Sequence, residues 1–196
     1  MTSVLTAVCI KPRRNWALPT VPTVIEETVR DERHQPRSFS YLAMGPLIIQ
    51  EALQEPGHAG YIGGLGRYFG HEIVGKAYFI FVDTGDRYHT GEPFLSSDVF
   101  FPLPTRDEDP VLLRIGEKYR ESFDFLLNSL LISSSVHEVL ILCEYNGNVT
   151  WIGDTTFGGL VRDTIQVYGP WSTSEFWEMH DDNLIEQGSI IILHAK

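Results

Sequence analysis

The side chains best suited to acid–base chemistry lie around a glycine-rich segment at residues 60–70. Arg67 lies inside this segment, His71 and Glu72 follow it directly, and His89 comes after the next apolar run. A histidine that is oriented by a carboxylate can act as a general base, and an arginine can hold an anion. These four residues are therefore the first candidates for the site of a small hydrolase or transferase.

The other motifs that carry chemistry are absent or incomplete. The glycine-rich segment lacks the Gly-Lys-Ser/Thr ending of a P-loop and the G-x-G-x-x-G spacing of a dinucleotide site, so we expect a turn there. The histidines form no H-x-x-x-H pair, the two cysteines form no zinc knuckle, and no G-x-S-x-G motif occurs. A metal site at His71, Glu72, Asp83 and His89 is a minor alternative. We assign no catalytic residue, no metal ligand and no cofactor.

Acidic residues are concentrated in the C-terminal third of the chain. The 196 residues carry 15 basic and 26 acidic side chains, which gives a formal net charge of −11. Residues 121–196 hold two basic and eleven acidic side chains, whereas residues 1–37 have a net charge of +2. Phosphate contacts need clustered lysine and arginine, so we expect no nucleic-acid and no membrane partner. A field of this sign attracts a basic protein instead.

Three of the four tryptophans lie in the same acidic third. Aromatic anchors inside a charged rim are typical of protein-binding surfaces, and packing in the core is the competing interpretation for each tryptophan. The candidate partner-binding residues are Trp151, Asp154, Trp171, Glu175, Trp177, Glu178, Asp181, Asp182 and Glu186. A second candidate contact is a proline-rich polar loop expected over residues 83–109, with seven acidic side chains.

The elements that position these residues follow from hydrophobic periodicity and turn signals. Apolar or alternating runs predict strands over residues 2–10, 38–44, 72–82, 138–145, 149–152, 164–168 and 189–194. A T-x-x-E capping pattern at Thr23 predicts a helix over residues 24–33, and Pro46 predicts a helix to about residue 54. Ser172 or Ser174 is expected to cap a helix that runs to about Ile185.

The best-defined element is an amphipathic helix over residues 111–131, whose leucine and aromatic residues recur at three- and four-residue spacing. Together with the hairpin and crossover signals, it predicts an α+β protein. We expect a single domain over residues 1–196, with a mixed, mostly antiparallel sheet packed by this helix.

The cysteines and the N-terminus indicate the compartment. Cys9 and Cys143 lie in apolar runs, so we expect two buried free thiols. The first apolar run precedes the basic residues, in the wrong order for a secretory signal, and no apolar run reaches the length of a membrane span. We therefore expect a soluble cytoplasmic protein.

An acidic, single-domain α+β chain with no catalytic motif and an aromatic-acidic face resembles the immunity proteins of bacterial polymorphic toxin systems. The resemblance lies in composition and layout over the whole chain. It implies a binding module that inhibits a cognate basic toxin, through the acidic and tryptophan residues named above. A small enzyme with a His/acid site and a structural subunit of a complex are the alternatives.

Overall fold

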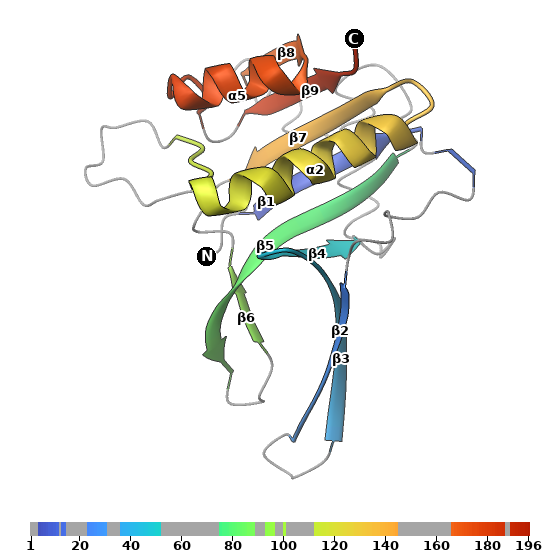
Figure 1. The fold of residues 1–196 in the computed structure, drawn as a ribbon, viewed down its shortest axis with the longest axis vertical. Helices are drawn as coiled ribbons and strands as arrows, with labels where there is room; N and C mark the ends of the chain where they lie inside the picture. The colour runs from blue at the N-terminus through green and yellow to red at the C-terminus, as the bar shows by residue number, and fades with distance from the viewer. Residues whose placement is uncertain are drawn as a thin grey trace, which may run out of the picture.

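The computed structural model describes residues 4–11, 13–14, 23–30, 36–51, 75–88, 93–96, 100, 112–144, 166–186 and 189–196. Within this part of the chain, nine strands form one sheet in the order β2-β3-β4-β5-β1-β7-β9-β8, with β6 paired to the end of β5 (Figure 1). The strands are β1 (Val4–Ile10), β2 (Thr23–Arg30), β3 (Pro36–Met44), β4 (Leu47–Glu51), β5 (Gly75–Arg87), β6 (Pro93–Ser96), β7 (Glu138–Glu144), β8 (Val167–Trp171) and β9 (Ile190–His194).

The strand pairing confirms a mixed, mostly antiparallel sheet and an α+β fold. β8 and β9 pair in parallel, and every other described pair is antiparallel. β1 lies at the centre between β5 and β7. Its residues Leu5, Ala7 and Cys9 are fully buried in the main core, and Thr6 and Val8, which alternate with them, are also fully buried.

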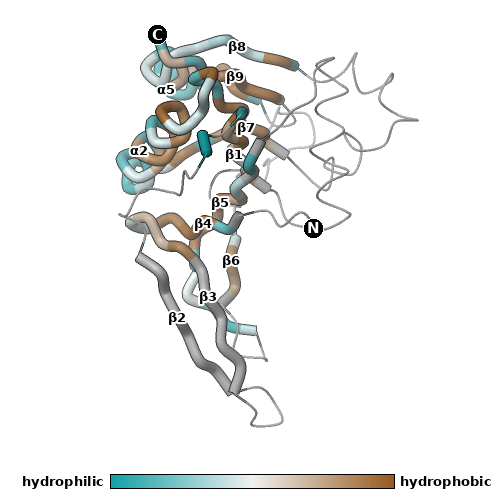
Figure 2. The backbone as a smooth tube through the Cα atoms, turned by 90° about the vertical axis from the view of Figure 1, so that its right-hand side faces the viewer, coloured by the Kyte–Doolittle hydropathy of each residue, from teal (hydrophilic) through white to brown (hydrophobic). Residues whose placement is uncertain are grey.

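Two helices, α2 (Glu117–Ser133) and α5 (Thr173–Asp181), lie on the same side of the sheet (Figures 1 and 2). The buried stripe of α2 includes Phe123, Leu127 and Leu130, which share one core with Leu5 of β1 and with Phe176 of α5. The sequence predicts a sheet packed by one long helix, whereas in the structure α2 shares this layer with α5, the helix that is also predicted after Ser172.

The predicted helix over residues 111–131 begins later than expected, at Glu117. The residues before it use their backbone groups elsewhere. The N–H of Leu113 donates to the carbonyl of Ile185 at 2.9 Å, and Leu112 forms an isolated bridge with Glu186. These contacts keep the segment out of the helix, and periodicity alone does not reveal them.

Two helix predictions in the first quarter of the chain are wrong. In place of the helix predicted over residues 24–33, β2 covers Thr23–Arg30 and pairs with β3 along its whole length. The helix expected from Pro46 is β4. Pro46 instead follows Gly45 in the two-residue loop between β3 and β4, where Gly45 has a φ of 58°. A positive φ at the first loop position is what such hairpins require.

Part of the loop expected over residues 83–109 is a hairpin. β5 continues to Arg87 and pairs with β6, and Gly85, with a φ of 84°, lies where the register shifts. Phe100 is fully buried, and the rest of that loop lies outside the described residues. The strand expected over residues 149–152 also lies outside them.

The two cysteines are buried thiols outside any disulfide, as predicted. The Sγ of Cys9 donates to the carbonyl of Leu130 at 3.4 Å, and burial raises the pKa of this thiol to about 11. Such a thiol stays protonated and unreactive near neutral pH. No helix in the described part of the chain is long and apolar enough to cross a membrane.

Candidate functional site

The acidic helix α5 begins at a capping box, as its sequence predicts. Ser172 is the N-cap, its hydroxyl accepts from the N–H of Glu175, and the Glu175 carboxylate accepts from the N–H of Ser172 at 2.7 Å. The helix ends at Asp181, four residues before the predicted end. Asn183 has a φ of 56°, so the chain turns away from the helix axis there.

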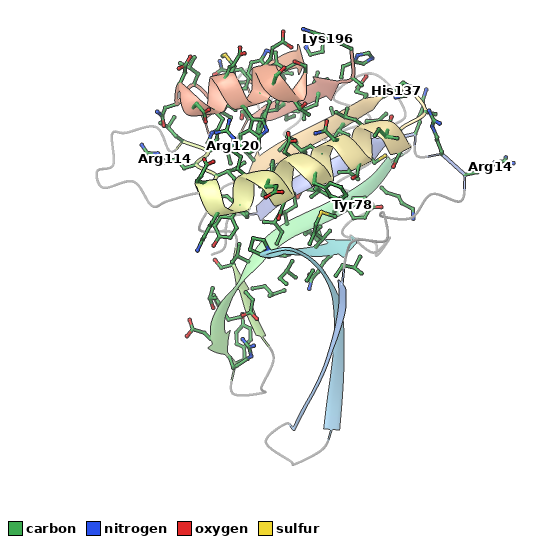
Figure 3. The ribbon with its side chains drawn as sticks, viewed as in Figure 1. Arg14, Tyr78, Arg114, Arg120, His137 and Lys196 are labelled. Atoms are coloured by element: carbon green, nitrogen blue, oxygen red, sulfur yellow. The ribbon has the colours of Figure 1, made fainter. Side chains whose placement is uncertain are left out.

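Three contacts join α5 to α2 in an ordered series. Arg120 contacts Asp181, Asp124 contacts Trp177, and Asn128 contacts Thr173. The residue number rises by four along α2 while it falls by four along α5, so the two helices run antiparallel. Figure 3 shows Arg120 between the two helices. We call these six residues the interhelical ladder.

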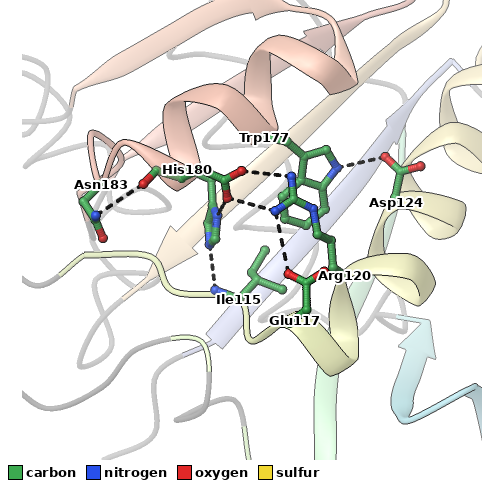
Figure 4. Close-up of polar contacts among 8 residues, drawn as sticks. Ile115, Glu117, Arg120, Asp124, Trp177, His180 and Asn183 are labelled. Atoms are coloured by element: carbon green, nitrogen blue, oxygen red, sulfur yellow. Dashed lines mark hydrogen bonds and ion pairs between the residues drawn. The ribbon is translucent and has the colours of Figure 1, made fainter.

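Trp177 is the central member of the ladder. Its side chain is 7% exposed, and its indole N–H donates to the Asp124 carboxylate at 2.9 Å (Figure 4). The guanidinium of Arg120 lies 4.5 Å from the centre of its ring, and Phe123 contacts it edge-on with ring centres 6.0 Å apart. A tryptophan placed this way anchors α5 to the core.

Asp181 is held by two side chains. The two terminal nitrogens of Arg120 donate to its two oxygens at 2.9 and 3.0 Å, a bidentate pair that lowers the pKa of Asp181 and raises that of Arg120. Nδ1 of His180 lies 3.0 Å from the same carboxylate. Nε2 of His180 accepts the N–H of Ile115 at 2.8 Å, so the ring proton of the neutral imidazole lies on Nδ1 and points at Asp181.

The Glu175 carboxylate also bonds to other groups within the protein. Beyond its capping bonds to Ser172, one of its oxygens accepts from Lys196 at 2.9 Å. The Ser172 N–H, then Lys196 and the Ser172 hydroxyl, lower the pKa of Glu175 to about 2. Its negative charge therefore persists far into the acid range.

The remaining candidate residues that the structure describes are more exposed to solvent. Trp171 is half-buried and stacks on Tyr168, with ring centres 5.3 Å apart. Glu178, Asp182 and Glu186 are exposed. Trp151 and Asp154 lie outside the described residues, as do four enzyme candidates, Arg67, His71, Glu72 and His89.

An open groove of about 590 Å³ runs beside the ladder. Its lining consists of Glu117, Arg120, Glu121, Asp124, Thr173, Ser174 and Trp177. The lining contains three carboxylates and one guanidinium, and that guanidinium is already paired with Asp181. The candidate residues predicted from the sequence do not include the α2 side of this groove. The sequence does contain a signal for it: a polar face on the predicted helix, with residues three and four positions apart. These residues are Glu117, Arg120, Asp124 and Asn128.

The described residues contain no group of three or more histidine, cysteine or acidic side chains that could hold a metal ion. Comparison of the chain with protein-family models, with curated protein sequences and with solved structures gives no match in any of the three.

Proposed function

We propose that the chain is an acidic protein-binding module that binds and inhibits a basic partner in the cytoplasm, as immunity proteins of toxin systems do. One observation carries this proposal, the charge of the two helices and of the segments that flank them, which we call the helical layer. Residues 112–133 and 166–186 contain eight acidic and three basic side chains. A surface of one sign speeds the encounter with a partner of the opposite sign.

Internal pairing divides the eight carboxylates into two sets. Asp124, Glu175 and Asp181 accept hydrogen bonds from within the structure. The other five are exposed, and we call them the outer carboxylates: Glu117, Glu121, Glu178, Asp182 and Glu186. Glu117 is 3.9 Å from Arg120 and 89% exposed, and no ion pair within the described residues involves the other four. The outer carboxylates supply the field that a basic partner would meet.

The groove supports the same proposal. Glu117 and Glu121 belong to its lining, and both are exposed. A lysine or arginine side chain from a partner has an apolar stem and a cationic end, which suits a groove with a tryptophan and several carboxylates. Trp171, half-buried at the sheet edge, is a further candidate for contact with the partner.

Co-expression tests this function. The product of the gene next to this one is expressed in a bacterial host, alone and together with the chain. We expect growth arrest without the chain, rescue with it, and a complex of the two purified proteins that forms more slowly at high salt. A neighbouring product that is harmless, or that forms no complex with the chain, would contradict the proposal.

A further inference from the structure

The two edges of the sheet differ in how they are protected. β8 is five residues long and contains Pro170, which has no N–H to donate. β2, at the opposite edge, is eight residues long and contains neither proline nor glycine. No described strand pairs with the outer side of β2. Its outward N–H and C=O groups are therefore a template for another strand.

β2 and β3 extend together as a ribbon away from the rest of the molecule (Figures 1 and 2). β3 pairs with β2 over Pro36–Ala43 but with β4 only over Leu42–Met44. Among the described strands, residues 36–41 of β3 therefore have β2 as their one neighbour, so most of the ribbon is two strands wide. Two strands by themselves are marginally stable in water, and a third would stabilise them.

We propose that β2 pairs with β2 of a second copy of this chain, antiparallel, about a two-fold axis at Thr28. Backbone groups of successive residues point to opposite edges of a strand, so two residues that face each other across an antiparallel interface either both direct their backbone groups toward it or both direct them away from it. An antiparallel self-pairing therefore places the two-fold axis at a residue that faces its own copy. The charges of β2 then select among the possible registers.

Registers centred at Glu26 or Glu27 place a glutamate opposite its own copy, which is unfavourable. The register centred at Thr28 places Glu26 opposite Arg30 of the second copy, and symmetry repeats this pair. A register centred at Ile25 has the same length but sets each glutamate opposite an uncharged residue. The Thr28 register is thus the one that matches opposite charges. This interface is independent of the acidic helical layer and of the function proposed for it.

Charge reversal at the two ends of the pair tests this register with the full chain. Sedimentation velocity over a range of concentrations should show a reversible dimer for the wild type. Glu26→Arg and Arg30→Glu should each weaken the dimer at least about tenfold, because each replaces two opposite-charge pairs with two like-charge pairs. Mixing the two variants should restore a dimer, because both cross-chain pairs of the mixed dimer again join an arginine to a glutamate. The double variant E26R/R30E should dimerise by itself for the same reason.

Arg37→Glu is the matched control, since Arg37 belongs to the same ribbon but to β3, opposite Val29. It should leave the dimer unchanged, and circular dichroism should show a retained fold for every variant. A wild-type chain that is monomeric at all concentrations would overturn the proposal. A dimer that survives both single reversals, or single variants that stay monomeric when mixed, would overturn it equally.

Discussion

The two faces of α5 carry similar residues and use them differently. On the face toward α2, Trp177 and Asp181 each have a partner on that helix, and His180 bonds to the backbone just before it. On the other face, Glu178 and Asp182 are exposed. A high content of acidic and aromatic residues therefore does not by itself locate a binding surface. Carboxylates that bond within the structure hold the two helices together, whereas in the function proposed above the outer carboxylates attract the partner.

The largest expected effect is on the inner face, at Trp177. Trp177→Ala removes the side chain that joins α5 to the core, and we expect a loss of about 3–5 kcal/mol in the free energy of unfolding. Trp177→Phe keeps an aromatic ring and removes the bond to Asp124, so it should cost about 1 kcal/mol. Urea denaturation measures both. An alanine variant as stable as the wild type would show that the ladder does not hold the helices together.

A smaller effect is expected at Arg120. Its guanidinium contacts the Trp177 ring and Asp181, whereas Lys118, the comparison residue, lies 4.7 Å from the centre of the Tyr119 ring and is exposed. Arg120→Met should lower the free energy of unfolding by about 0.5–1 kcal/mol through the loss of the ring contact, and it also removes the ion pair with Asp181. Lys118→Met should have less effect on the melting temperature. Equal effects would mean that the ladder contact adds nothing beyond an ordinary surface cation.

Glu175 should make the stability of the fold depend on pH in the acid range. Its folded pKa of about 2 lies below the ordinary value of 4.5, so its contribution is complete above the ordinary value and is lost as the pH falls toward the folded value. Glu175→Gln should therefore be less stable than the wild type at neutral pH, and the difference should shrink between about pH 4.5 and about pH 2. A difference in melting temperature that stays constant over this range would contradict the capping role of the carboxylate.

The smallest effect on stability is expected on the outer face. Glu178→Gln with Asp182→Asn should change the free energy of unfolding by less than about 0.5 kcal/mol, because neither carboxylate has an ion-pair partner among the described residues. Urea denaturation under the conditions used for Trp177→Ala gives a direct comparison. A large loss of stability here would show that the outer carboxylates also support the fold.

Patterns formed by residues close together in the sequence predicted the structure well. The buried strands β1 and β9, the capping box at Ser172 and the long helix α2 all follow from period, composition or a three-residue spacing. The errors at β2 and β4 have one cause. Their local signals, a T-x-x-E pattern and a proline, are compatible with a helix start. Pairing with other strands determines the outcome, with β3 for β2 and with both β3 and β5 for β4.

The candidate surface was predicted in outline. The sequence identified α5 and its carboxylates but could not separate Asp181, which faces Arg120 from 61 positions away, from Asp182 beside it. That distinction depends on the antiparallel placement of two helices. For the same reason the sequence does not predict that Glu117, Glu121 and Asp124 line the groove, because the groove forms only where α2 lies beside α5.

We propose that the outer carboxylates, and not the paired ones, attract a basic partner. The most direct test is the association rate constant between the chain and the product of the neighbouring gene, for the wild type and for E178Q/D182N/E186Q. We expect the triple variant to associate several-fold to about tenfold more slowly at low salt and to depend less on salt, with unchanged stability. An unchanged rate constant with an unchanged salt dependence would contradict the claim.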